Sequence, residues 1–491
     1  MATELTAPEL KKGLNASIHD GILSQMMVTL TSGVFLVSLA LELGASNVVI
    51  GLLAAIPALM QLVQIPAVLL VEKYQKRKRI SLLTSIISRS FLFFIVLLPF
   101  LFEPQTGIVV LLIVLFIHTG FGAISGCSWN SWMSDLIPKK QLGSFFSKRM
   151  AWSLGLSIPL SLSAALFLDN WDSFFSFSII YAYAILFFLG LIFGLIGLVY
   201  LSRVPEPAMV VQKRVSLFSR LSEPFKDQNF KRLMVFTGSW SFAVSLAAPF
   251  FTVYMIKRLG YDISVIILLV VLSQIVHVWF LRIWGKFSDY KSNKAVLSIS
   301  GPLFIFSLFL WTFTTLPETH YFTFSLVVFL HILMGIAMAG VTLAMGTIGL
   351  KLAPEGKSTS FLAANSLIVA ITSAVGPLLG GLLADFFLDK ELGLLLTWRT
   401  MGGQIAVQTL NFQQWDFFFF SAFLVGIYAL HRLAMVTEKG EVEEPLTLHE
   451  VLSEARVSVH NISPMGLVVG IVQFPISFLK SGLTYITRKK P

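Results

Sequence analysis

Residues 174–201 read FFSFSIIYAYAILFFLGLIFGLIGLVYL, a run of 28 residues without one charged side chain. A helix that crosses a bilayer needs about 20 consecutive apolar residues, so this run predicts a membrane-spanning helix. The rest of the 491-residue chain is similar, because 56% of its residues are apolar, 13% are charged, and its mean hydropathy is +0.81. A soluble domain carries about 25% charged residues, so the composition excludes a soluble domain, a disordered chain, collagen, a coiled coil and a disulfide-stapled secreted fold.

Eleven further apolar runs predict an all-α, polytopic membrane protein with twelve transmembrane helices. Barrel strands would be about 10 residues long and alternating, whereas these runs are longer and unbroken. The predicted spans are 17–41, 47–71, 80–102, 107–136, 150–168, 174–201, 230–256, 262–284, 295–316, 321–350, 358–388 and 415–437.

The placement of Lys and Arg predicts the orientation. If the N-terminus is inside, the inner loops and the tail carry 30 of the 36 basic residues, whereas the outer loops carry 4. Basic residues collect on the cytoplasmic side, so we expect both termini in the cytoplasm and the chain in the cytoplasmic (inner or plasma) membrane. The net charge of +10 therefore reflects membrane topology and predicts no nucleic-acid partner.

Polar breaks divide the chain. The longest internal one, 202–229, predicts a cytoplasmic linker between an amino-terminal half, 1–201, and a carboxy-terminal half, 230–437. In the tail, 438–491, the apolar run 464–486 is followed by three basic residues. A thirteenth span would carry that basic end outside, so we expect an interfacial helix on the inner leaflet.

The two halves are copies of each other. A constant shift of 216 residues brings similar short segments of the two halves together, which predicts parallel six-helix repeats of the kind found in transporters. The aligned pairs are Leu43-Gly44 with Leu259-Gly260, Val49-Ile50 with Val265-Ile266, Leu136-Ile137-Pro138 with Leu352-Ala353-Pro354, and Ser144-Phe145 with Ser360-Phe361.

The loops after the second and eighth predicted spans carry a family resemblance. Residues 285–294 read GKFSDYKSNK and are similar to the G-x-x-x-D-(R/K)-x-G-(R/K)-(R/K) loop of the major facilitator superfamily, with Tyr290 and Ser292 as departures. Residues 68–77 read VLLVEKYQKR, where the glycines are lost and Glu72 replaces the aspartate. The resemblance covers about residues 15–437.

The resemblance implies alternating access around a cavity lined mainly by spans 1, 4, 7 and 10. It also implies that carboxylates at span ends pair with loop cations and helix termini and so lock one face. The alternative is that these charges simply face water. The implied gating residues are Glu72, Lys76, Arg77 and Asp135 in the amino half, and Asp289 and Lys294 in the carboxy half.

Ionisable side chains inside spans are functional candidates, because they are expensive in a membrane. The predicted spans have no carboxylate near their middle: Asp20 falls near the inner end of the first span. Four basic or titratable groups lie deep: Arg89, His118, His277 and His331. We expect Arg89 to face a cavity, a carbonyl cluster or an anionic ligand.

His331 is the best single candidate for coupling or ligand binding. It lies about ten residues into the tenth span, and a local glycine alignment places it where related exporters keep an arginine. Histidine titrates near neutrality, so it could carry a coupling proton. The alternative is a neutral histidine that packs between helices.

Other polar and aromatic residues inside spans could bind an organic solute or could only join helices. No metal-ligand cluster and no phosphate-binding loop is present, so neither a metal nor another cofactor is predicted. These further candidates are Gln25, Thr29, Asn130, Trp132, Trp240, Gln274 and Asn365.

These observations predict a secondary active transporter, not an enzyme. We expect a monomer in contact with membrane lipid that moves a small organic solute, with protons as the candidate coupling ion. The alternative is a protein of the same fold that does not transport: a sensor, an assembly factor or a pigment-delivery scaffold.

Overall fold

Long helices make up most of the computed structural model of the chain. The structure describes residues 6–138, 141–207, 222–315, 320–354, 358–400, 403–438, 450, 451 and 453. Within these ranges, twelve helical segments are long and apolar enough to cross a membrane, as the sequence predicts. The predicted tail helix at 464–486 and most of the predicted linker lie outside the described residues.

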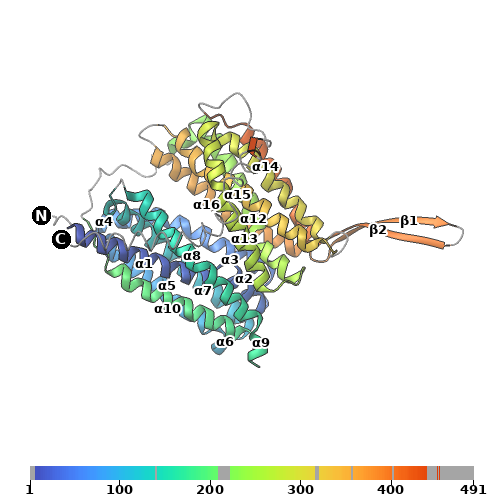
Figure 1. Cartoon of the computed structure of the whole chain (residues 1–491), viewed down its shortest axis with the longest axis horizontal. Coiled ribbons are helices and arrows are strands. Elements are labelled where there is room, and N and C mark those ends of the chain that lie inside the picture. Colours follow the sequence, from blue (N-terminus) through green and yellow to red (C-terminus); the bar gives the residue numbers. More distant parts are fainter. Residues whose placement is uncertain are drawn as a thin grey trace.

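The amino half supplies the first six spans, which Figure 1 shows in blue to green. Its first span, Pro8–Glu42, is broken at Ser32, where the next residue, Gly33, has a φ of +59° that suits glycine. Its elements are α1 (Ala7–Thr31), α2 (Gly33–Glu42), α3 (Asn47–Met60), η1 (Gln61–Val63), α4 (Gln64–Tyr74), α5 (Arg77–Val96), α6 (Leu98–Leu101), α7 (Pro104–Leu136), α8 (Leu142–Asp169), α9 (Trp171–Phe174) and α10 (Ile180–Ser202).

The carboxy half supplies the other six spans and a pair of strands. Its core is rich in aromatic side chains, of which Trp284, Trp311, Phe236 and Phe250 are almost fully buried. Its elements are η3 (Glu223–Phe225), α12 (Gln228–Lys257), α13 (Ile263–Tyr290), α14 (Asn293–Trp311), η4 (Thr312–Thr315), α15 (Thr323–Leu352), α16 (Ser358–Phe386), β1 (Glu391–Thr400), β2 (Gly403–Gln413) and α17 (Gln414–Ala434).

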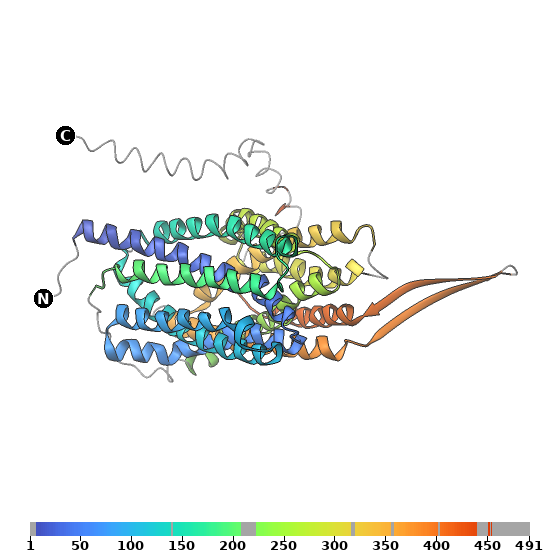
Figure 2. The same ribbon diagram turned by 90° about the horizontal axis from the view of Figure 1, so that it is seen from below.

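Strands β1 and β2 pair as an antiparallel hairpin with an irregularity at Leu394/Leu395. This hairpin was not predicted, because its leucine-rich first strand lacks the alternation that marks a half-buried strand. Figure 2 shows the hairpin projecting from one end of the helices, whereas α1 begins at the opposite end. We call these the hairpin end and the termini end of the molecule.

Two predicted spans have different boundaries in the structure. The first helix begins at Ala7, ten residues before the predicted start at 17. Its first turns contain polar residues, which a prediction from hydropathy leaves outside the span. The sixth long helix begins at Ile180 and not at 174. The aromatic residues before it belong to α9 and a following bend, where Phe174 is 76% exposed.

The two halves meet along two pairs of helices. Helix α3 packs along α16, and α8 packs against α13. Close backbone approach explains the first contact, because a Cβ added at Gly381 would lie 2.8 Å from the Cα of Val48. Both residues lie near the hairpin end, so the backbones of the two halves approach closely there.

Candidate functional site

Three adjoining cavities lie along helix α1. The polar cavity, of about 280 Å³, is lined by α1, α5, α7 and α8 and contains Asp20, Arg89 and His118. The arginine cavity, of about 220 Å³, lies between α1 and α8. The interface cavity, of about 230 Å³, adds residues of α13 and therefore joins the two halves. Shared lining residues connect them, because Val28 lines all three.

Asp20 and two arginines form the charged centre of the polar cavity. The Asp20 side chain is 4% exposed, with Oδ1 3.5 Å from Nη2 of Arg89 and Oδ2 3.8 Å from Nη2 of Arg149. Ser24 donates a hydrogen bond of 3.2 Å to Asp20 Oδ1. Arg89 also donates to Ser24 Oγ at 2.9 Å and to the carbonyl of Gly194. Of the three surroundings expected for Arg89, a cavity, a carbonyl cluster or an anionic ligand, the structure gives it a cavity and the carbonyl of Gly194.

Glycines on neighbouring helices make room for the two arginines. A Cβ added at Gly197 of α10 would lie 2.9 Å from Nη1 of Arg89, and one at Gly21 of α1 would lie 2.6 Å from Cζ of Arg149. Real side chains avoid such contacts. The small residues therefore allow long charged side chains to reach the middle of the amino half.

Serines and a histidine line the α5–α7 side of the polar cavity. Ser85 and Ser125 lie 2.6 Å apart through their hydroxyl groups, and Ser81 lies 3.2 Å from Ser125. His118 Nδ1 lies 2.8 Å from the carbonyl oxygen of Ser88, and Ser88 donates to the carbonyl of His118 at 2.8 Å. These bonds join the two helices, so His118 both packs and borders the cavity.

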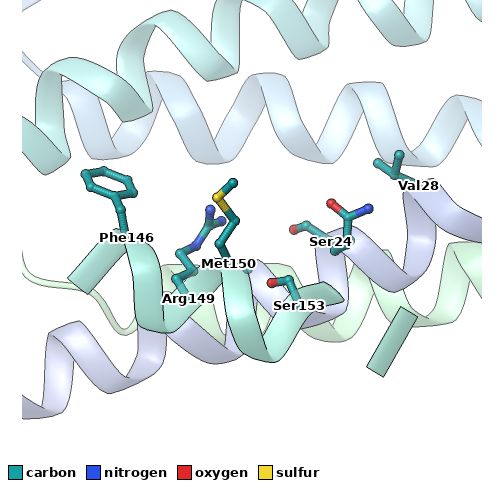
Figure 3. Close-up of a pocket in the computed structure, with 8 residues that line it drawn as sticks. Ser24, Val28, Phe146, Arg149, Met150 and Ser153 are labelled. Atoms are coloured by element: carbon teal, nitrogen blue, oxygen red, sulfur yellow. The ribbon is translucent and has the colours of Figure 1, made fainter. Parts of the chain in front are cut away.

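The arginine cavity places one cation beside apolar walls. Figure 3 shows Arg149 and Met150 of α8 directed toward the same space as Ser24 of α1. The Arg149 guanidinium lies over the Trp129 ring, 4.6 Å from its centroid. Such a site combines charge recognition with a flat aromatic surface.

Three predicted residues meet in the interface cavity. Gln25 and Thr29 of α1 line it from the amino half, and Gln274 of α13 lines it from the carboxy half. The helix break at Ser32 and Gly33 borders the same space. The structure therefore brings together polar groups from both halves in one cavity.

The other candidate side chains in spans lie elsewhere. Trp132 is fully buried and donates to the carbonyl of Pro205 at 2.8 Å. Trp240 packs against Phe304. Asn365 accepts a bond of 2.6 Å from Thr237 and so joins α12 to α16. Asn130 is exposed and His277 is half-buried, and neither residue lines one of the three cavities.

His331 lies inside the carboxy half, away from the three cavities. His331 is only 7% exposed, and its Nδ1 lies 2.8 Å from the carbonyl oxygen of Val327. Its ring meets the Trp311 ring edge-on, with 5.7 Å between the ring centroids. This environment is that of a packed ring. A coupling role for His331 stays a prediction.

The predicted amino-half gating residues separate into two pairs. Arg77 is fully buried and binds Asp135, and it also donates to the carbonyls of Ser131 at 2.9 Å and Pro207 at 2.8 Å. Glu72 and Lys76 are exposed, and the described part of the chain offers neither of them an ion pair. The structure thus assembles one predicted pair and leaves the other open.

In the carboxy half, a different carboxylate takes the place expected for Asp289. Asp289 is exposed. Glu438 is 6% exposed and accepts bonds from the backbone N–H of Lys294 at 2.7 Å and from the side chain of Asn293 at 3.0 Å. It therefore caps the start of α14 within its own half, at the termini end.

At the hairpin end, carboxylates bridge the two halves. Asp169 of α8 accepts bonds from the backbone N–H groups of Ile263 at 3.0 Å and Ser264 at 2.9 Å. Asp385 of α16 accepts from the Asn47 side chain at 2.8 Å and from the backbone N–H of Val48 at 3.2 Å. Each carboxylate sits at a helix N-terminus, where negative charge is favourable.

Sequence reasoning did not select Asp20 and Arg149 as site residues, because both fall near the edges of predicted spans. Asp20 falls near the edge of the predicted span 17–41, yet it lies in the thirteenth position of the helix Pro8–Glu42. Arg149 falls just before the predicted span at 150, yet α8 begins at Leu142. In the structure Asp20 lies well inside this helical segment, beside Arg89 and Arg149. The sequence did contain one signal for this site: Asp20 and Arg149 have opposite charges, and oppositely charged side chains can pair and so lie inside helices.

Comparisons with known proteins agree on the fold. The family model of the Major Facilitator Superfamily matches residues 21–276 and 233–479. The nucleoside transporter NupG is similar in structure, with a TM-score of 0.61 and 15% identity over 87% of this chain and 100% of that one. No curated protein matches the chain by sequence.

Two other solved structures share the architecture. One is a bacterial homologue of the human lysosomal transporter Spinster in an inward-facing, unoccupied conformation, with a TM-score of 0.55 and 14% identity over 78% of this chain and 84% of that one. The other is a POT family transporter in complex with 5-aminolevulinic acid. Its TM-score is 0.59, and it is 13% identical over 87% of this chain and 97% of that one. The twelve helices, the duplicated halves and the family match together show that the chain belongs to the Major Facilitator Superfamily.

Proposed function

We propose that this protein moves a small organic solute across the membrane by alternating access. The positive-inside rule places the termini end in the cytoplasm, so the hairpin end faces outward. In this orientation, the contacts between the halves at the hairpin end support an inward-facing state. The similar transporters bind or carry small molecules, a nucleoside in one case and 5-aminolevulinic acid in another, which supports a solute of that size.

The observation that carries this proposal is the position of the contacts between the halves. Asp169 and Asp385 hold the halves together at the hairpin end. The interface cavity, with Gln25 and Gln274 on opposite walls, lies between the halves. A transporter needs a solute site between two halves and a closure on one side that can be released. The structure supports both requirements.

We propose that the solute contacts residues of the three cavities. Asp20, Arg89 and Arg149 supply charge, and Gln25 and Gln274 supply hydrogen-bonding groups from the two halves. Reaching across the interface would let the solute bias the relative position of the halves, because a ligand shifts an equilibrium by its differential affinity for the two states.

Thiol accessibility tests alternating access without knowledge of the solute. In a Cys127→Ser background, Leu154→Cys places one thiol in the interface cavity at a side chain that is 37% exposed. A membrane-impermeant maleimide is applied to vesicles of each orientation. Lys73→Cys marks the termini side and Trp398→Cys marks the hairpin side, since both native side chains are exposed.

We expect Leu154→Cys to react quickly from the termini side and more slowly from the hairpin side. Reaction from both sides, with each marker reacting from one side, is the signature of a cavity that opens alternately. Reaction from one side alone would contradict transport if it persists after the hairpin-end contacts of Asp169 and Asp385 are removed. That result would favour a static protein of the same fold.

A further inference from the structure

The polar and arginine cavities contain one more cation than anion. Asp20 is the single carboxylate among the described residues that line them, whereas Arg89 and Arg149 are both cations. Arg89 is closely engaged, because it donates to Gly194 and Ser24 and pairs with Asp20. Asp20 is therefore shared by two cations, and Arg149, at the longer distance of 3.8 Å, is the less engaged of them.

Most hydrogen-bond donors of Arg149 are unused. A guanidinium has five N–H groups in a rigid planar fork. The Nε group donates to the carbonyl of Ser17 at 3.3 Å, and Nη2 lies 3.8 Å from Asp20 Oδ2, which is beyond hydrogen-bond range. For the remaining N–H groups the described residues provide no hydrogen-bond acceptor. The side chain is 24% exposed and lines both cavities.

A buried or half-buried cation with free donors is costly unless an anion joins it. One monovalent anion on Arg149 would balance the cavity, with Asp20 left on Arg89. A carboxylate suits this position, because its two oxygens match the guanidinium fork in a bidentate pair. Gly21 makes room for the Arg149 side chain to lie against α1, since a Cβ there would lie 2.6 Å from Cζ.

The walls next to Arg149 describe the rest of the ligand. Met150, Phe146 and Val28 give the arginine cavity an apolar side, and Trp129 presents its ring beneath the guanidinium. The two cavities have volumes of about 220 and 280 Å³ and share Val28 and Arg149. This space suits a small molecule with one charged end and an apolar body.

We infer that the cavity between α1 and α8 binds a small organic monocarboxylate through a bidentate contact with Arg149. This inference rests on the proposed function, since it names the class of solute that the transporter would carry. The carboxylate supplies the charge that the cavity lacks, and its apolar body lies against Met150, Phe146 and Trp129.

Ligand-dependent stability tests the inference on the purified full-length protein. Benzoate and 3-phenylpropionate are the carboxylate probes, their amides are the neutral counterparts, and phenyl phosphate is the alternative oxyanion. All are compared at equal ionic strength set with sodium chloride. We expect the carboxylates to raise the midpoint of thermal unfolding by about 2 °C or more, and the amides to leave it unchanged.

Three variants locate the effect. Arg149→Gln should abolish the shift, and Arg149→Lys should reduce it severalfold because an ammonium lacks the fork. Arg203→Gln removes an exposed arginine at the termini end of α10 and should keep the full shift. Arg149→Lys keeps the charge, so it provides the test if Arg149→Gln does not fold.

Each other outcome overturns the inference. Equal shifts with amides would show a neutral site, a shift that persists in Arg149→Gln would place binding elsewhere, and a shift with phenyl phosphate alone would exclude the carboxylate class. No shift with any probe would show that Arg149 binds no such ligand. The Leu154→Cys experiment uses no ligand, so it tests transport separately from carboxylate binding. Labelling from both sides without stabilisation by a carboxylate would overturn this inference and leave the proposed transport intact. Stabilisation by a carboxylate with labelling from one side alone would overturn the proposed transport and leave the binding site intact.

Discussion

Asp169 and Asp385 are 216 positions apart, and each accepts two hydrogen bonds from the start of a helix in the opposite half of the molecule. Asp169 binds the first two residues of α13, Ile263 and Ser264, and Asp385 binds the first two residues of α3, Asn47 and Val48. Asn47 and Val48 are also 216 positions before Ile263 and Ser264. The shift that relates the repeats therefore also relates the two closures of the hairpin end.

We expect these carboxylates to stabilise the state in which the hairpin end is closed. A charged hydrogen bond to a helix N-terminus at a partly exposed site is worth about 1 kcal/mol. Asp169→Asn combined with Asp385→Asn should therefore cost the closed state about 2 kcal/mol, or a factor of about 30 in population. The measurement is the rate of Leu154→Cys labelling from the hairpin side, which should rise.

Asp172→Asn is the control for this pair, because Asp172 is exposed beside the same helix end and makes no hydrogen bond to the described residues of the other half. It should leave the labelling rate unchanged. If the double variant also leaves it unchanged, the two carboxylates do not hold the closure.

Asp289→Asn should act in the opposite direction. Asp289 is exposed in the present state, so its loss should cost this state little. The family motif predicts that it locks the termini end in the alternative state. Removing it should therefore favour the present state and slow labelling of Leu154→Cys from the hairpin side by about 3- to 10-fold, which corresponds to about 1 kcal/mol.

The matched control for Asp289 is Glu103→Gln, which removes an exposed carboxylate at the other end of the molecule. Faster labelling in Asp289→Asn would mean that Asp289 supports the present state, contrary to the motif.

Sequence predicted the helices better than the charged site because the two depend on different information. Hydropathy alone predicts twelve spans, since each must be apolar along its length. Hydropathy places Asp20 and Arg149 near the edges of predicted spans, because charged residues lower the mean hydropathy of any segment that includes them. Their pairing comes from three helices, α1, α5 and α8, packing together. No local pattern contains that relationship.

The interface cavity and the hairpin illustrate the same difference. Gln25, Thr29 and Gln274 are predicted as polar groups inside spans, and the structure gathers them in one cavity. The closures at Asp169 and Asp385 could have been found from the repeat, because the aspartates and their partners all share the 216-residue shift. The hairpin could not, because it has no counterpart in the amino half.

Gly381→Ala tests whether close packing of α3 and α16 closes the hairpin end. A Cβ at this position would lie 2.8 Å from Val48 Cα, and backbone cannot rotate out of the way. We expect a loss of about 1–3 kcal/mol from the closed state. The variant should show faster hairpin-side labelling of Leu154→Cys, together with a lower midpoint of thermal unfolding.

Gly155→Ala is the control, because no atom lies within 4 Å of a Cβ at Gly155. Alanine is the better helix former by about 0.5–1 kcal/mol, so this variant should be as stable as the native protein or more so. A similar loss in both variants would mean that the effect belongs to helix glycines in general and not to the α3–α16 contact.

His331 gives the last test, because coupling and packing predict different results for one substitution. Its ring meets Trp311 edge-on, and its Nδ1 lies 2.8 Å from the carbonyl of Val327. His331→Phe keeps an aromatic ring in the same space and removes the titratable group. If the residue packs, as this environment favours, the variant should stay folded but lose about 1–3 kcal/mol of stability, because phenylalanine is larger than histidine and lacks the nitrogen that bonds the Val327 carbonyl. The pH dependence of Leu154→Cys labelling between pH 5 and pH 8 should then match the native protein, as it should in the control His277→Phe. If His331 carries a coupling proton, that dependence should weaken in His331→Phe alone while the protein stays folded.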